Sequence, residues 1–385
     1  MRPSNGETRC HIMKRWTRAL QNMKDSSDFV TFRKNKYART ILFSAILAAL
    51  AIVWTLGDDR LVAGVDKPGP TLFTSVPLQP PEVQNVILLS WDGLDRSVVK
   101  ELLTRKKVPG LAHLLQEGSF QEIAVHGHAT VTKPGHAEIL TGLSADITGV
   151  HANWLGTYRP IPEGYTIFER LQTRFGKDNI ATIFVAGKLA HLGGRGPGEP
   201  IRPEQFRATS KWFPKGLPKG ADDVLGTETI GEPFFLTKKH LNVFDIGQRD
   251  SDVVGPLCLR YLNQYKSKRF LAFFHCSDTD HVGHHHGSAS SEYREAAVDC
   301  DKWLGRIISW LKQEKLYAST LIYVTTDHGF DLNARTHGHA PHSWLVTNDK
   351  LVSRGGILAD IAATILVRFG LDLEKLAPPL LGQPL

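Results

Sequence analysis

The sequence VILLSWDG at residues 86–93 decides the fold class of this 385-residue chain. Its apolar run, Val86–Ser90, is short and typical of a buried strand. The pair Asp92-Gly93 follows at the end of that strand. A strand that is apolar on both faces indicates a parallel sheet that is covered by helices on both sides.

Further along the chain, two other apolar runs also end in loops that are rich in Asp and His. Phe270–His275 (FLAFFH) leads into DTDHVGHHHG at 278–287, and Ser319–Thr325 (STLIYVT) leads into TDHG at 326–329. A fourth run, Ile180–Ala186, also predicts a strand. Short apolar strands, several of them followed by Asp- and His-rich loops, therefore recur along one domain.

Helical periodicity fills the intervals between these strands, at residues 98–117, 291–313 and 357–369. The alternation predicts an α/β fold with a mostly parallel central sheet sandwiched by helices. Residues 188–250 break the rhythm with loop-like sequences such as GGRGPGEPIRP. We interpret this stretch as an irregular cap or insertion near the functional site.

The N-terminal part has a different composition. Residues 1–40 are basic and carry much of the excess behind the formal net charge of +7, and residues 41–57 form an apolar segment without charges. That segment is roughly long enough to cross a bilayer, which takes about 17–25 residues. We expect a transmembrane anchor there. A cleaved signal sequence and a buried core helix are the alternatives.

A basic flank before an apolar run is a topology signal, so the positive charge does not indicate nucleic-acid binding. The flank should stay in the cytoplasm, which places the rest of the chain outside it, in a periplasmic or extracellular location, or secreted if the segment is cleaved. Residues 58–83, rich in Pro, Gly and Asp, predict a linker to a catalytic domain at 84–385. With four cysteines and no CxxC motif, the chain is not a disulfide scaffold.

The loops after the strands carry the candidate metal ligands. In open α/β sheets, ligands bind beyond the carboxyl ends of the strands, so these loops could converge. Nine of the 17 histidines fall within 275–286 and 328–342. Carboxylates and neutral imidazoles suit zinc or a similar divalent ion. Asp280 and His284 are four residues apart and can face one ion, whereas Asp327 and His328 need a bend to point the same way.

A candidate nucleophile lies in TVTKPGHAEILTG at 130–142. The Pro-Gly pair predicts a turn, and the residues after it predict a helix whose N-terminus lies near Thr132. Free N–H groups and the helix dipole favour an anion there. A threonine hydroxyl attacks well only when a metal or a base activates it. Taken alone, Thr132 could simply be the N-cap.

These motifs together resemble the type I phosphodiesterases and nucleotide pyrophosphatases, a branch of the alkaline phosphatase superfamily. TKPGHAEILTG resembles the family's nucleophile motif, GLSADITGVHANWLG its continuation, DHVGHHHG its Asp-x-x-Gly-His loop and TTDHGF its Asp-His-Gly motif. The resemblance covers most of residues 84–385 in the family's order. It implies an alkaline phosphatase-like fold.

The resemblance also implies roles for individual residues. Asp92, Asp327 and His328 would hold one metal, which also takes the hydroxyl of Thr132. Asp280, His284 and a later histidine would hold the second. We choose His337 for that position, with His339 and His342 as competitors.

Thr132 would form a phospho-threonine, while Asn153 and the N–H of Thr132 would contact the phosphoryl oxygens; a turn role for Asn153 is the alternative. Both metals are expected to be zinc, although manganese or iron also suits such ligands.

The expected activity is hydrolysis of a small phosphate ester, either a diester or a monoester. The alternatives are a membrane-linked transferase of the phosphoethanolamine type and a non-catalytic binding protein. Sulfatases share the fold but need a cysteine or serine in a Cys-x-Pro-x-Arg setting, and no cysteine here has that context. Lys133 follows the nucleophile where nucleotide-cleaving relatives often carry Phe. It could add positive charge for a dianionic monoester or point to solvent.

Overall fold

The computed structural model describes residues 83–200, 229–247 and 250–385, which fall within one compact unit, Pro77–Leu385. The basic segment 1–40, the apolar segment 41–57 and nearly all of the linker 58–83 lie outside the described residues, so their predicted roles stay predictions. In the part of the chain that is described, no helix has both the length and the apolar character needed to cross a bilayer.

An eight-stranded sheet forms the centre of this unit, in the order β4-β3-β5-β1-β6-β7-β2-β8. The strands are β1 (Asn85–Trp91), β2 (Ser119–Ala124), β3 (Ile180–Ala186), β4 (Val243–Ile246), β5 (Arg269–Cys276), β6 (Thr320–Thr325), β7 (His342–Thr347) and β8 (Gly356–Ile357). Only β7 is antiparallel to its neighbours, β6 and β2; the other pairings are parallel. The predicted mostly parallel sheet is therefore confirmed.

Strand β1 shows why its sequence is apolar at every position from Val86 to Leu89. Ile87, Leu89 and Trp91 point into the core on one side of the sheet, and Val86 and Leu88 point into the core on the other side. Each fully buried side chain of this size contributes about 1.5–3 kcal/mol relative to exposure. Both faces must consequently be covered by helices.

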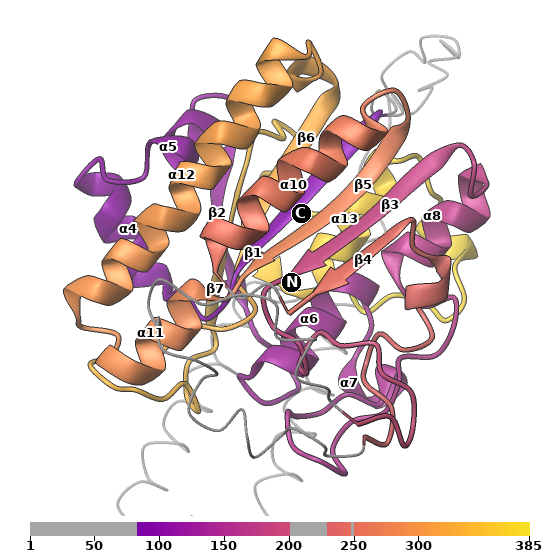
Figure 1. Ribbon diagram of the computed structural model, residues 1–385, viewed down its shortest axis with the longest axis horizontal. Coiled ribbons are helices and arrows are strands. Elements are labelled where there is room, and N and C mark those ends of the chain that lie inside the picture. Colours follow the sequence, from indigo (N-terminus) through magenta and orange to yellow (C-terminus); the bar gives the residue numbers. More distant parts are fainter. Residues whose placement is uncertain (1–82, 201–228, 248–249) are drawn as a thin grey trace, which may run out of the picture. The chain divides into compact units, whose positions relative to one another are not determined.

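The helices occupy the two faces as follows. α10 and α12 cross one face, with α4 and α5 beside them, and the opposite core is lined by α6, α8 and α13 (Figure 1). Their bounds are α4 (Arg96–Thr104), α5 (Pro109–Leu115), α6 (Thr132–Thr141), α7 (Ala145–Thr148), α8 (Ile167–Phe175), α10 (Ser251–Tyr265), α11 (Asp278–His286), α12 (Ser291–Gln313) and α13 (Ala359–Arg368), with short 3₁₀ turns at Lys238–His240, Tyr317–Ser319 and Leu373–Lys375.

Two features differ from the sequence-based expectation. The helical segment expected at 98–117 is two helices, because Lys106 has a left-handed backbone (φ 54°) and Pro109, which lacks an N–H, begins α5. Within 188–250, Val243–Ile246 forms β4 and extends the sheet at its edge, while residues 201–228 and 248–249 of the expected insertion lie outside the described residues.

A buried ion pair joins the sheet to α13. The Arg368 Nε donates to Asp349 Oδ2 at 2.6 Å, and the Tyr323 hydroxyl donates to the same oxygen at 2.7 Å. Burial raises the pKa of Tyr323 well above its usual value, so its hydroxyl keeps its proton and remains a donor. Asp349 is thus the acceptor for two buried donors.

We therefore expect Asp349→Ala to lower the free energy of unfolding by about 3–5 kcal/mol, because it leaves a buried guanidinium without a counter-charge. Urea unfolding followed by far-UV circular dichroism measures this. Lys350→Ala, at the exposed neighbouring position, is the control and should change stability little. A loss below 1 kcal/mol for Asp349→Ala would contradict the assigned role of the pair.

Candidate metal centre and active site

The candidate site is assembled where neighbouring parallel strands end. Asp92 follows β1, Asp327 follows β6, and Asp280 lies in α11 directly after β5. These strands are hydrogen-bonded neighbours in the order β5-β1-β6, so their carboxyl ends meet at one edge of the sheet. The N–H of Gly93, next to Asp92, accordingly donates to Asp327 Oδ1 across 234 positions of the chain.

The first group contains Asp92, Asp327 and His328, all fully buried. The His328 Nε2 lies 3.6 Å from Asp92 Oδ1 and 3.4 Å from Asp327 Oδ2. The His328 Nδ1 donates to the carbonyl of Gly329 at 2.9 Å, which leaves the Nε2 lone pair facing the two carboxylates. The bend that adjacent Asp327 and His328 required is therefore present.

The second group contains Asp280, His284 and His337. Asp280 and His284 lie one turn apart on α11, and the His284 Nε2 lies 3.3 Å from Asp280 Oδ1. The His337 Nε2 lies 3.7 Å from the same oxygen. The Nδ1 atoms of both histidines lie within hydrogen-bond distance of backbone carbonyls, those of Arg335 and Thr130, so both Nε2 atoms are turned toward Asp280.

The competing histidines lie elsewhere. The backbone of His339 donates to Asp331, and the Nδ1 of His342 lies 3.3 Å from the guanidinium of Arg96. Neither belongs to a candidate metal group among the described residues.

Unsatisfied atoms test whether these residues fit metal ions. Among the described residues, the buried atoms without a hydrogen-bond partner include Asp92 Oδ1, Asp280 Oδ1, Asp327 Oδ2 and His328 Nε2. These atoms point into the two groups described above. Buried carboxylate oxygens are normally paired, because leaving them unpaired costs free energy. Divalent cations would satisfy all four atoms, so the residues fit such ions.

Thr132 is the first residue of α6, and Val131 is its N-cap, so the N-cap interpretation of Thr132 is wrong. Its side chain is 1% exposed. The Oδ1 of Asn153 accepts from the backbone N–H of Lys133 at 2.8 Å, which places Asn153 against the same helix N-terminus. Because Oδ1 is used in this way, the amide NH₂ of Asn153 is left to donate to a ligand.

Lys188, directly after β3, was not predicted as a site residue. Its Nζ lies 2.9 Å from Thr132 Oγ1, 2.9 Å from Asp92 Oδ2 and 2.7 Å from Asp280 Oδ2. Burial alone would lower the pKa of Lys188, but Asp280, Asp92 and Asp327 raise it above its usual value, so the side chain is an ammonium. The sequence signal for Lys188 was its position just after the end of a strand. It was not used, because Lys188 lay inside the segment 188–250 that was interpreted as a cap.

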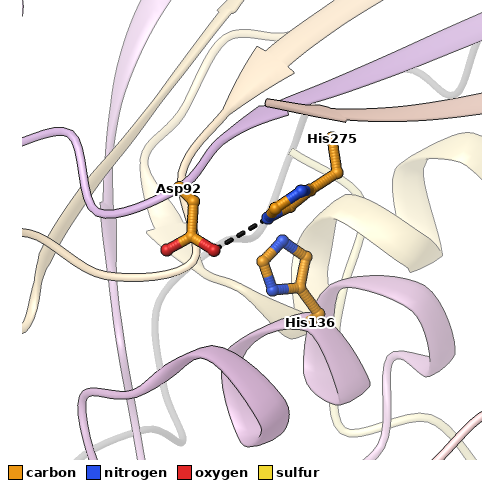
Figure 2. Close-up of side chains that lie close together, drawn as sticks. All are labelled: Asp92, His136 and His275. Carbon is orange, nitrogen blue, oxygen red and sulfur yellow. Dashed lines mark hydrogen bonds and ion pairs between the residues drawn. The ribbon is translucent and has the colours of Figure 1, made fainter. Parts of the chain in front are cut away.

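Two buried histidines behind the first group were also missed. Figure 2 shows the rings of His136 and His275 beside Asp92, and the His275 Nε2 lies 2.7 Å from Asp92 Oδ2. The His275 Nδ1 accepts from the N–H of Gly187, so its proton is on Nε2, which donates to Asp92.

His136 is held in a similar way. Its Nδ1 lies 2.9 Å from the carbonyl oxygen of Thr132 and 3.4 Å from Asp327 Oδ2, and its Nε2 lies 2.8 Å from Ser90 Oγ. Burial lowers the pKa of His136 to about 4, so the ring is neutral at neutral pH. Neutral His136 therefore donates from Nδ1 and accepts from Ser90, which ties Thr132 to β1.

Lys133 does not point to solvent. It is 4% exposed, with Nζ 2.5 Å from the carbonyl of Asn153 and 3.7 Å from the centre of the Tyr158 ring. Burial lowers the pKa of Lys133 to about 8.

A further buried group joins Cys276, Asp278 and Cys300. Burial raises the pKa of Cys300 well above its usual value, and Asp278 already accepts from the backbone and the hydroxyl of Ser251. These partners do not favour metal binding, which needs a thiolate. Cys258, Cys276 and Cys300 are all free thiols.

Residues 86–372 match the family described as type I phosphodiesterase / nucleotide pyrophosphatase. This chain belongs to that family. One relative is ectonucleotide pyrophosphatase/phosphodiesterase family member 5 of Homo sapiens, 24% identical over 263 residues, or 67% of this chain. The match spans 47% of the length of that relative.

The fold is also similar to that of a solved protein, Ps i-CgsB. The TM-score is 0.52 and the identity 16%, and the match covers 78% of this chain and 75% of that one. A second crystal structure of Ps i-CgsB, in complex with k-i-k-neocarrahexaose, gives the same values. At this identity the similarity concerns the fold alone.

The close approach of α6 to the Asp327 loop gives a test of the metal groups. A Cβ at Gly135 would lie 2.8 Å from the Asp327 carbonyl oxygen and 2.9 Å from its Cβ. We expect Gly135→Ala to displace Asp327 and weaken zinc binding about 10- to 100-fold, the range for changes that disturb the orientation of metal ligands. Isothermal titration calorimetry measures it.

Gly305→Ala is the matched control, because a Cβ there meets nothing within 4 Å and the position is in a helix. It should leave zinc affinity unchanged and raise stability slightly. Equal affinities for the two variants would show that the contact at Gly135 does not position Asp327.

Proposed function

We propose that this chain is a metal-dependent phosphoric ester hydrolase that acts through a phospho-threonine at Thr132 between two divalent ions. The observation that carries the proposal is the position of the Thr132 hydroxyl. It lies at the N-terminus of α6, and a single ammonium, Lys188, links it to a carboxylate of each Asp/His group. Family membership supports the same class of activity.

Asp92, Asp327 and His328 would hold one ion, and Asp280, His284 and His337 the other. Bound divalent ions supply Lewis-acid stabilisation of oxygens that gain negative charge during displacement at phosphorus. Zinc suits the Asp/His ligand sets. The neutral histidines behind the first group support metal binding there, because His275 orients Asp92 and His136 lies beside Asp327.

The chain's own residues bind and orient the phosphoryl group. The N–H of Lys133 is used by Asn153, and Pro134 has no N–H, so the N–H of Thr132 is the donor of that first turn left for a phosphoryl oxygen. The amide NH₂ of Asn153 is the second donor. Such fixed donors stabilise the charge that builds on the equatorial oxygens.

The proposed reaction has two displacements. Thr132 Oγ loses its proton to solvent and attacks phosphorus; the Oγ–P bond forms, and the bond to the leaving alcohol breaks. The leaving oxygen keeps the electron pair and takes a proton from water. In the second step a water oxygen attacks phosphorus, the Oγ–P bond breaks, and Oγ regains a proton.

The proposed substrate is a small phosphate ester. Nucleotide diesters are the first class to test, because the family description names nucleotide pyrophosphatases. Phosphate monoesters are the alternative, and buried Lys133 beside the nucleophile supplies positive charge for either. Attachment to a membrane through residues 41–57, with the catalytic domain outside the cytoplasm, remains part of the proposal.

Thr132→Ala should abolish turnover of both bis-p-nitrophenyl phosphate and p-nitrophenyl phosphate in the zinc-loaded protein, because the nucleophile is removed. The loss should exceed 10³-fold, as for other covalent nucleophiles. Spectrophotometric rates and mass spectrometry of acid-quenched protein, which detects phospho-Thr132, measure it.

The control is Thr141→Ala, which changes a threonine at the other end of α6. This variant should still form phospho-Thr132 and turn over both esters. The wild-type ratio of the two rates separates diesterase from monoesterase. Turnover that survives in Thr132→Ala would refute the nucleophile. If an alcohol acceptor is consumed faster than water, the enzyme is a transferase instead.

The second group gives a prediction for metal content. His337→Ala should lose one of two zinc ions per chain, because His337 is the member of the second group that does not come from α11. Elemental analysis after dialysis measures the stoichiometry. His342→Ala, the former competitor, should retain both ions, and loss of zinc from His342→Ala alone would reverse the assignment.

A further inference from the structure

Lys188 occupies a defined place between the two metal groups. Its three N–H bonds match three acceptors: Thr132 Oγ1 at 2.9 Å, Asp92 Oδ2 at 2.9 Å and Asp280 Oδ2 at 2.7 Å. The side chain is 7% exposed. An ammonium has three donors, so this contact set leaves none unused.

The lysine uses the carboxylate oxygens that do not point into the metal groups. Asp92 offers Oδ2 to Lys188 and Oδ1 to the His328 group; Asp280 offers Oδ2 to Lys188 and Oδ1 to His284 and His337. Both Oδ1 atoms have no hydrogen-bond partner in the described residues. The lysine therefore does not compete with metal ions for the Oδ1 atoms of these two carboxylates.

The backbone before Lys188 is fixed to β5. The N–H of Gly187 is shared between the carbonyl oxygen of His275 at 3.0 Å and its ring Nδ1 at 3.2 Å. His275 also donates to Asp92 Oδ2, so the strand that aims Asp92 also places the lysine. The residue next to Lys188 is therefore anchored to the same histidine that donates to Asp92.

We propose that Lys188 is a catalytic residue, a third positive centre that remains between the two metal ions and stabilises the Thr132 alkoxide. The proposal rests on the phosphoryl-transfer function proposed above.

The lysine acts on the nucleophile through charge. The Nζ of Lys188 donates to Thr132 Oγ1 at 2.9 Å, so a positively charged donor already faces the nucleophile. When the Thr132 proton leaves for solvent, the ammonium gains a full negative partner. When Oγ–P forms, the electron pair moves into that bond, and the same contact favours Oγ as leaving group in the second displacement. Such fixed donors are effective where water is excluded.

The test replaces the charge and keeps the shape. Lys188→Met in zinc-loaded protein should bind two zinc ions and lower kcat by about 10²-fold or more, the effect of removing one preorganised donor. The fraction of chains trapped as phospho-Thr132 should fall with it. Lys188→Arg should retain more activity than Lys188→Met. Methylammonium or ethylammonium added to Lys188→Ala should restore part of the lost rate, which a purely structural role would not allow.

Lys239→Met is the control, because Lys239 is an exposed lysine paired with Glu163 and should change nothing. A Lys188→Met enzyme with two zinc ions and a kcat within threefold of wild type overturns the proposal. So does a zinc-loaded crystal structure in which Nζ has left Thr132 Oγ.

If wild type turns over neither ester, the proposed function fails by itself, and the zinc-loaded structure still decides the place of Lys188. If Lys188→Met does not fold, rescue of Lys188→Ala by alkylammonium, or its absence, decides its role.

Discussion

Burial of negative charge at one edge of the sheet is the constraint on which the rest of the structure depends. Asp92, Asp280 and Asp327 are at most 3% exposed and lie close together. An ionised carboxylate loses most of its hydration there, and the cost is several kcal/mol unless positive charge is near. Among the described residues the side-chain cation in contact with two of them is Lys188. One ammonium does not balance the negative charge of three carboxylates, and divalent cations would supply the missing positive charge.

The same constraint accounts for the neutral histidines around the carboxylates. His136 and His275 each have one nitrogen that accepts from a neighbour and one that faces a carboxylate. The His275 ring thus holds Asp92 by a hydrogen bond, and the neutral His136 ring lies 3.4 Å from Asp327 Oδ2 without adding charge. The free oxygens of these carboxylates are directed toward His328. Two fully buried histidines thus lie against the carboxylates of the first group.

Much of the fold could be predicted from the sequence, because β1, β3, β5 and β6 are continuous apolar runs that only a doubly covered sheet explains. Strand β2, with the exposed Glu122 and Ala124, and the two-residue β8 carry no such pattern and were missed. The candidate ligands Asp92, Asp280, His284, Asp327 and His328 were predicted because acidic and histidine-rich motifs follow strands and resemble those of the family, and His337 was chosen from its distance after the Asp-His-Gly motif. Thr132 was predicted from its motif.

Lys188, His136 and His275 escaped for a physical reason. A lysine just after a strand, or a single histidine inside a strand or helix, has no sequence pattern that distinguishes a charged bridge or an orienting ring from a surface residue. Their roles depend on contacts with residues far away in the chain. Lys188 meets Asp280 across 92 positions and His275 meets Asp92 across 183. Such pairings belong to tertiary structure.

The neighbouring pairing of β1 with β6 has a consequence for how the site comes into existence. Asn85 pairs with Thr320 in this ladder, so the first group of ligands is complete only when both ends of a very long loop have met. Contacts of this sequence separation form slowly, because a long loop must close before they can form. Metal ions would then find no assembled ligand set in partly folded chains, and a nascent chain would acquire its ions only after the last central strand has been synthesised.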